Sequence, residues 1–230
     1  MIHKDFNCEI YFIRHGESES NATPGLAAGT NFDAPLTKLG HQQAKLLGKR
    51  FKNDKINFDK VYCSTLTRAI QTTENIFIGM ESPNNSFQKV PAIIEQQVPG
   101  WRGIPIEEAY AGETMAYMME KGRDFVGPDG ESIREVQRRA TNWLEDELIY
   151  NRELASKPIS LKVAIVGHGN TSRAIFQYIM GFDDRLTYRL GIGNTSISRF
   201  VFDKSGWSVL SLNDATHLDG SQDSNFEVRS

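Results

Sequence analysis

Two histidines stand at the ends of apolar runs, and each precedes a glycine. His15 follows Ile10–Ile13 and Arg14, and His168 follows shortly after Val163–Val166. We interpret both runs as buried strands, so both imidazoles lie where a strand ends. In open α/β sheets, ligands bind in the crevice outside the carboxyl ends of the strands. Two imidazoles there, one of them beside an arginine, indicate chemistry on an anion.

The Arg-His-Gly sequence suits phosphoryl transfer. The planar guanidinium of Arg14 matches two phosphate oxygens, and the neutral imidazole of His15 can attack phosphorus to form a phosphohistidine. Gly16 allows close approach to the backbone, and a helix that begins between Ser18 and Asn21 would point free N–H groups at an anion. Taken alone, however, Arg-His-Gly more often marks only a strand that ends at the surface.

Further donors fall at the ends of other predicted strands. Arg68 lies in the first turn of the helix that follows the strand Lys60–Ser64, and a doubly wound sheet can bring such ends together. These groups would stabilise the phosphoryl oxygens electrostatically in the transition state. The predicted set around one phosphoryl group consists of Arg14, Asn21, Arg68 and His168.

A leaving alkoxide also needs a proton. Glu95 ends the run Val-Pro-Ala-Ile-Ile-Glu, and a carboxylic acid beside a bound phosphate suits a general acid. Glu107 and Glu108 instead lie on a predicted solvated helical face. A single glutamate at a strand end is, by itself, better explained as a surface charge.

The elements that must position these residues alternate short apolar runs with amphipathic stretches. This alternation predicts an α/β fold, a three-layer α/β/α sandwich with a mostly parallel central sheet. Two further strands joined by Lys204-Ser205-Gly206 predict a C-terminal β-hairpin. The predicted strands are Glu9–Arg14, Lys60–Ser64, Val90–Ile94, Leu161–Gly167, Ser198–Asp203 and Trp207–Leu212.

Capping and stop signals predict the helices. We expect helices from a Thr37 cap to Phe51, from Leu66 to a stop at Gly79, from a Ser132–Glu135 capping box through Leu144, and from an Asn170 cap to Gly181. We expect one domain over residues 1–230, with a catalytic core at about 9–214 and a frayed tail at about 219–230. An excursion at about 98–130, around the helix Ile106–Met119, would cover the crevice.

Composition excludes several classes of protein. The 230 residues carry a net charge of −3, which is no electrostatic footprint for nucleic acid. Cys8 and Cys63 do not form a Cys-x-x-Cys pair. No apolar segment approaches the length of a membrane span, and the N-terminus lacks a secretory signal. We therefore expect a cytoplasmic protein without nucleic-acid or membrane partners.

Several blocks of sequence, in order, resemble the histidine phosphatase superfamily of phosphoglycerate-mutase-like proteins. The first is Arg-His-Gly-Glu at 14–17 with Asn21. The others are Asp33–Thr37 with Gly40 and Gln43-Ala44, Tyr62–Ala69 with Gln71-Thr72, Glu95 with Gly100–Gly103, Gly130–Ser132, and Val166–Gly169. Each block is weak alone, but their number and order make the resemblance specific.

The resemblance implies a role for each residue. His15 would be phosphorylated, Glu95 would donate the proton and then act as base, and His168 would assist catalysis. Arg14, Asn21, Arg68, His168 and Gly169 would hold the phosphoryl group. No metal ion and no other cofactor is implied, and the partner would be a small-molecule phosphate ester.

The resemblance leaves the reaction open between two enzymes and a binding module. Cofactor-dependent phosphoglycerate mutases carry an Arg-His-Tyr-Gly-type segment directly after the glutamate, where this chain has Gln96–Pro99, and Arg102 stands where the family often has Glu. The C-terminal part resembles the broad-specificity phosphatase branch, so we favour a phosphatase over a mutase. A non-catalytic phospho-ligand-binding module is a weaker alternative, because the expected catalytic groups are present. A homodimer through an edge strand or the hairpin is compatible with the sequence, but nothing selects it.

Overall fold

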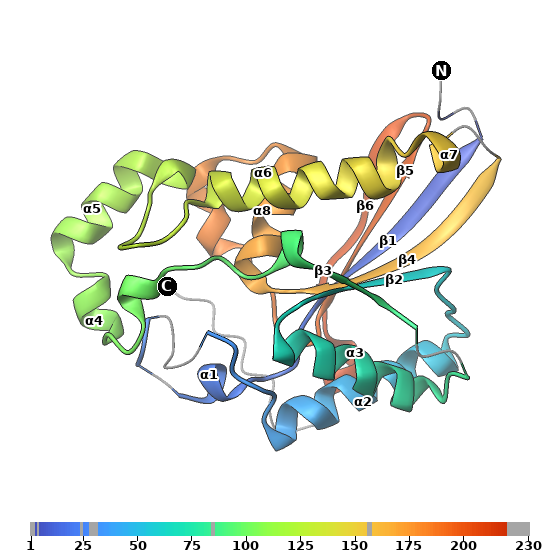
Figure 1. Ribbon diagram of the computed structural model, residues 1–230, viewed down its shortest axis with the longest axis horizontal. Coiled ribbons are helices and arrows are strands. Elements are labelled where there is room, and N and C mark those ends of the chain that lie inside the picture. Colours follow the sequence, from blue (N-terminus) through green and yellow to red (C-terminus); the bar gives the residue numbers. More distant parts are fainter. Residues whose placement is uncertain are drawn as a thin grey trace.

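The computed structural model describes residues 3, 5–23, 25–27, 32–83, 86–155 and 158–219. Within these residues, one sheet has the strand order β3-β2-β4-β1-β5-β6 (Figure 1). Neighbours from β3 to β1 pair in parallel, whereas β5 is antiparallel to both β1 and β6. The strands are β1 (Phe6–Arg14), β2 (Lys60–Ser64), β3 (Gln88–Val90), β4 (Ile159–Gly167), β5 (Ile197–Asp203) and β6 (Gly206–Asp214).

Helices cover both faces of this sheet. In Figure 1, α6 (Ile133–Leu144) and α8 (Gly169–Met180) lie on one side, and α2 (Lys38–Asn53) and α3 (Thr67–Met80) on the other. Successive side chains of β1 point to opposite faces: Ile10 and Phe12 join the core under α6 and α8, whereas Tyr11 and Ile13 join the core under α2 and α3. The predicted three-layer sandwich and its C-terminal hairpin are confirmed. The short helices are α1 (Glu19–Ala22), α4 (Ile106–Ala109), α5 (Gly112–Lys121) and α7 (Arg152–Ala155).

Local capping signals are confirmed where their partners lie within one turn. The Thr37 hydroxyl accepts the Gly40 N–H at 3.0 Å and begins α2. Ser132 and Glu135 form the predicted capping box of α6. Gly181, with φ of +64°, ends α8. Each of these signals depends only on residues adjacent in the sequence, which is why the sequence displays it.

Several predicted boundaries are wrong. β1 begins at Phe6 and not at Glu9, and β4 begins at Ile159 and not at Leu161. β3 ends at Val90, because Pro91 has no N–H for the ladder and instead begins a 3₁₀ turn over Pro91–Ile93. The excursion helix is broken at Tyr110-Ala111 into α4 and α5. The last helix begins at Gly169 after His168, one residue before the predicted start, so Asn170 is not its cap.

Gly79 was predicted as a helix stop but lies inside α3. A Cβ atom there would meet the Lys45 carbonyl oxygen of α2 at 2.2 Å, and a Cβ atom on Gly48 would meet the Ile76 oxygen of α3 at the same distance. These glycines let α2 and α3 cross closely. The helix continues to Met80, and Glu81 follows it in the left-handed region.

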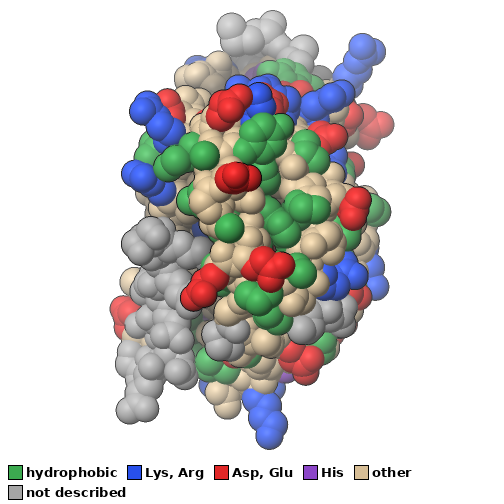
Figure 2. Space-filling model, turned by 90° about the vertical axis from the view of Figure 1, so that its left-hand side faces the viewer, with side chains coloured by type: hydrophobic (Ala, Val, Ile, Leu, Met, Phe, Trp, Pro, Cys, Tyr) green, Lys and Arg blue, Asp and Glu red, His purple; other side chains and the backbone are tan. Residues whose placement is uncertain are grey.

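The excursion at 98–130 lies beyond the carboxyl ends of β1 and β4 (Figure 1). It is joined to the segment after α1 by hydrogen bonds from Ala27 N to Ile104 O (2.9 Å) and from Ile106 N to Gly25 O (2.8 Å). Its small core contains Trp101, Ala109 and Phe125, whereas α5 has no buried residue. Figure 2 shows this end of the molecule, with hydrophobic side chains on its surface. The predicted tail lies, after Asp219, outside the described residues.

None of the helices in the described ranges combines the length and apolar content that a membrane span requires.

Candidate active site

His15 lies at the carboxyl end of β1 and is 3% exposed. Its Nδ1 atom lies 2.7 Å from the Gly16 carbonyl oxygen, and Arg68 Nε lies 3.1 Å from its Nε2 atom. A carbonyl only accepts and a guanidinium only donates, so Nδ1 carries the proton and Nε2 carries the lone pair. Burial, with the charges of Arg68 and Arg14 in addition, holds the pKa of His15 well below its usual value. The ring is therefore a neutral base whose free electron pair lies beside a cation.

His168 comes from the parallel neighbour β4 and meets His15 with ring centroids 5.1 Å apart. Its Nε2 atom lies 2.7 Å from the Ser64 hydroxyl. Its Nδ1 atom is buried and has no hydrogen-bond partner among the residues that the structure describes. Burial is also the main cause that lowers the pKa of His168, followed by the charge of Arg68. A buried polar atom without a partner is a natural contact for a ligand oxygen.

Two of the predicted residues, Arg14 and Arg68, supply cations to the site. Arg14 Nη1 donates to the Ile192 carbonyl at 2.6 Å, and Arg68 Nη1 donates to the Phe32 carbonyl at 2.6 Å. Arg68 is buried, being 6% exposed. These bonds to backbone carbonyls fix both guanidinium groups before any ligand arrives, which is the preorganisation that phosphate recognition requires.

Gly169 is the first residue of α8, and a Cβ atom on it would lie 3.7 Å from Arg14 Nε and 3.9 Å from Glu95 Oε2. The arginine, the glutamate and the helix N-terminus therefore converge at one place. Free backbone N–H groups at a helix N-terminus favour anions. The structure thus brings six of the predicted residues together: Arg14, His15, Arg68, Glu95, His168 and Gly169.

Glu95 follows the 3₁₀ turn after β3, and its carboxylate lies at the N-terminus of α8. Its Oε2 accepts the Asn170 N–H at 3.3 Å, and its Oε1 accepts the Thr171 N–H at 3.2 Å. A carboxylate from a distant segment therefore serves as the cap of α8, in place of a local side chain. Glu107 and Glu108 are exposed, as predicted.

Asn21 is the one predicted phosphate ligand that is exposed. Its Oδ1 closes a capping box with Ser18 at the start of α1 and also accepts from Asn194 Nδ2 at 3.3 Å. Because an amide oxygen only accepts, the Nδ2 group is the donor of the Asn21 side chain. Asn194 also donates to the His15 carbonyl at 3.0 Å, so it links Asn21 to the nucleophile candidate.

The turn after His15 is held by a close approach of two backbones. A Cβ atom on Gly16 would lie 2.6 Å from the Gly40 oxygen, and one on Gly40 would lie 2.0 Å from the Glu17 oxygen. The Gly16 N–H donates to the Thr72 hydroxyl at 2.9 Å. The first turn of α2 and the middle of α3 therefore fix the backbone beside His15.

Sequence reasoning missed the supporting residues Ser64, Thr72, Thr171 and Asn194. Ser64 and Thr72 both lie in the block Tyr62–Thr72 that carries the family resemblance, so that block is the available signal. Thr171 and Asn194 act through contacts with Glu95 and His15 that are distant in sequence, and no local pattern marks them.

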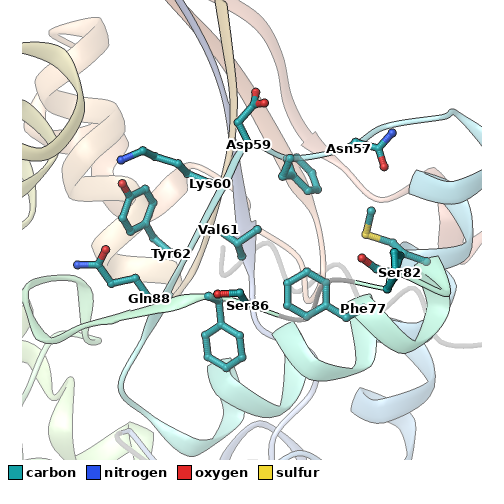
Figure 3. Close-up of a pocket in the computed structure, with 13 residues that line it drawn as sticks. Asn57, Asp59, Lys60, Val61, Tyr62, Phe77, Ser82, Ser86 and Gln88 are labelled. Carbon is teal, nitrogen blue, oxygen red and sulfur yellow. The ribbon is translucent and has the colours of Figure 1, made fainter. Parts of the chain in front are cut away.

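A separate hollow of about 440 Å³ lies at the other end of β2 (Figure 3). Its lining includes Lys60, Val61, Phe77 and Gln88. It contains none of the predicted site residues, so it is not part of this site. In the described part of the chain, no three His, Cys, Asp or Glu residues form a group that could hold a metal ion.

The chain matches a known protein family. The profile of the histidine phosphatase superfamily (branch 1) matches residues 10–215. A 2,3-bisphosphoglycerate-dependent phosphoglycerate mutase from Bartonella henselae is 30% identical over 177 residues, which cover 76% of this chain and 82% of the mutase.

Solved structures with the same fold include two phosphatases. A phosphoserine phosphatase variant from Entamoeba histolytica in complex with phosphoserine has a TM-score of 0.75 and 23% identity, over 92% of this chain and 99% of that one. A mycobacterial glucosyl-3-phosphoglycerate phosphatase has a TM-score of 0.70 and 20% identity, over 90% of this chain and 99% of that one. These two likenesses show the fold, and the profile and the curated relative show the family. The chain belongs to the histidine phosphatase superfamily.

Proposed function

We propose that the protein is a metal-independent phosphomonoesterase that hydrolyses a small phosphorylated metabolite through a phosphohistidine on His15. The observation that carries this proposal is the pair of contacts that the His15 ring makes, which assigns its tautomer. Its Nδ1 proton is bound to the Gly16 carbonyl, and its Nε2 lone pair faces Arg68. A neutral nucleophile beside a phosphate-binding cation is what in-line attack on phosphorus requires.

In the first step, His15 Nε2 forms a bond to phosphorus while the bond from phosphorus to the ester oxygen breaks. Glu95 gives its proton to the leaving oxygen. Arg14, Asn21, Arg68, His168 and the Gly169 N–H stabilise the charge on the transferring group. In the second step, water attacks phosphorus, Glu95 takes the proton from that water, and the nitrogen–phosphorus bond breaks. Phosphate leaves, and His15 returns to its neutral form.

The surroundings of Glu95 favour hydrolysis over a mutase reaction. A mutase must retain its phosphorylated intermediate while that intermediate reorients in the site, which calls for a closed, basic pocket. Three basic residues lie between Glu95 and Gly130. Arg102 is exposed, Lys121 pairs with Glu120, and Arg123 lies 3.6 Å from Asp184. None of these three basic residues is buried, so this stretch adds no basic wall of the kind that would retain a phosphorylated intermediate.

A phosphoglycerate mutase remains the second candidate, because the curated relative described above is a mutase. The structural neighbours are named as phosphatases. Both reactions use the same phosphohistidine, so only the fate of the phosphoryl group separates them.

The deciding experiment measures phosphate release with EDTA present. The esters are p-nitrophenyl phosphate, sugar mono- and bisphosphates, phosphoserine, and 3-phosphoglycerate with and without 2,3-bisphosphoglycerate. Metal-independent release from one ester supports the phosphatase and identifies its substrate class. Interconversion of 3- and 2-phosphoglycerate without release would instead identify a mutase. Binding of phosphate esters without either reaction would instead support a non-catalytic module that binds phosphorylated ligands.

A further inference from the structure

An ion pair outside the reaction centre holds the backbone on which Glu95 is carried. We propose that Arg139 of α6 and Glu131, at the turn before α6, are positioning residues for the proton donor. This inference rests on the proposed function, because it assigns Glu95 the role of general acid. It goes beyond that function by naming the groups that set where the acid stands.

Arg139 binds two carbonyl groups of the segment that ends at Glu95, one inside the 3₁₀ turn and one at Glu95 itself. Its Nη1 donates to the Ala92 carbonyl at 2.7 Å, and its Nη2 donates to the Glu95 carbonyl at 3.2 Å. Because this segment leaves the sheet at Val90, the β-ladder no longer fixes it. The guanidinium takes over that task from the side of α6.

Glu131 holds the next residues of the same segment. Its Oε1 accepts the Gln97 N–H at 3.0 Å, and its own N–H donates to the Gln97 carbonyl at 2.9 Å. Its backbone carbonyl accepts Gln96 Nε2 at 2.8 Å. This approach needs Gly130, where a Cβ atom would lie 2.6 Å from the Gln97 oxygen.

The two positioning residues also hold each other. Arg139 Nε and Nη2 donate to the two carboxylate oxygens of Glu131 at 3.0 and 2.7 Å, a bidentate pair. Their side chains are only 23% and 18% exposed. Planar pairs of this kind define orientation as well as distance.

The Glu95 segment is therefore held from two helices that are themselves packed together. α8 binds the carboxylate through the Asn170 and Thr171 N–H groups, and α6 binds the backbone through Arg139. Ile133, Val136 and Ala174 form a buried contact between α6 and α8. A displacement of about 1 Å can cost a catalytic group much of its effect. Loss of the pair should therefore impair proton donation selectively.

The test compares two esters that differ in their need for a proton. p-Nitrophenolate leaves with little protonation, whereas the alkoxide of an alkyl phosphate needs it. Glu95→Gln should lower kcat for the alkyl phosphate by about 100-fold, and much less for p-nitrophenyl phosphate. Arg139→Lys, which keeps the charge but loses the planar fork, should lower kcat for the alkyl phosphate by about tenfold and for p-nitrophenyl phosphate by less than about threefold.

A double-mutant cycle gives a readout that a merely structural role would not move. In the Glu95→Gln background, Arg139→Lys should have almost no further effect on kcat, because the group that it positions is gone. The matched control is Arg138→Met, which removes an exposed arginine of the same helix and should leave both esters unchanged. If Arg139→Lys folds poorly, Glu131→Gln replaces it in the test. Glu131→Gln keeps the shape of the pair and should show the same ester selectivity.

Equal losses of kcat for both esters, or losses that multiply in the double variant, would overturn the proposal. Failure of the unaltered protein to hydrolyse either ester would instead refute the proposed function itself.

Discussion

The buried part of the site, which contains His15, Arg68 and His168, and the excursion at 98–130 are packed in opposite ways. His15, Arg68 and His168 are almost wholly buried and are fixed by hydrogen bonds to protein groups. In the excursion, α5 has no buried residue, and Met119 is 74% exposed. One region is held by two sheet cores and the other by a small cluster around Trp101.

Under the proposed function, the buried region carries out the chemistry and the excursion selects the substrate. Groups that stabilise a transition state must be in place before the ligand arrives, because their reorganisation would raise the barrier. A region that admits different leaving groups benefits from weak local packing. We therefore expect substitutions in the buried part of the site to remove activity, and substitutions in the excursion to change the range of substrates.

The largest effect is expected from His15→Ala. Turnover should fall by about 10⁴-fold or more with every phosphate ester, because the substitution removes the nitrogen that is proposed to form the bond to phosphorus. Phosphate release measures this loss, and circular dichroism should show that the fold remains. The control is His3→Ala, since His3 is also buried but bonds the Ile149 carbonyl at the other end of β1. Retained turnover in His15→Ala would remove the nucleophile assignment.

Substitutions at two glycines should change the stability of the protein by an intermediate amount. Gly79→Ala should lower the free energy of unfolding by about 1–3 kcal/mol, because its Cβ atom would meet the Lys45 oxygen at 2.2 Å. Gly112→Ala, at the start of α5, meets nothing within 4 Å. It should raise that free energy by up to about 1 kcal/mol through the unfolded chain. Urea unfolding measures both, and equal changes would show that the two regions are packed alike.

The smallest effect concerns protonation. Burial and Arg68 lower the pKa of His15, so its ring resonances should not titrate around pH 6.5. In the unfolded chain His15 takes up a proton near pH 6.5, whereas in the folded protein it stays neutral to a lower pH. The contribution of His15 to the free energy of unfolding is therefore complete above pH 6.5 and is lost as the pH falls. Nuclear magnetic resonance against pH measures the midpoint, with His15→Ala to assign the signal. A midpoint at or above 6.5 would contradict the described environment.

The sequence predicted those features that short-range patterns determine. The strand Lys60–Ser64, the Thr37 cap and the Ser132–Glu135 box depend on neighbours in the chain. The convergence of His15, Arg68 and His168 followed from the rule that parallel strands end at one edge.

The features it missed depend on contacts between distant segments. Gly79 lies inside a helix because α2 crosses there, and α8 begins at Gly169 because Glu95 caps it from 74 residues away along the chain. Neither partner is visible from the local pattern. The break between α4 and α5 belongs to a region with little packing, where weak local preferences decide the boundaries.

The contact between Gly16 and Gly40 has a consequence for saturation mutagenesis. Neither residue supplies a side chain, yet any Cβ atom at either position would collide with backbone of the other segment. Both positions should reject every substitution, Gly40 as completely as the glycine beside His15. Intolerance at Gly40 would then report the distance between two backbones, and it would be a mistake to count this position among the groups that touch phosphate.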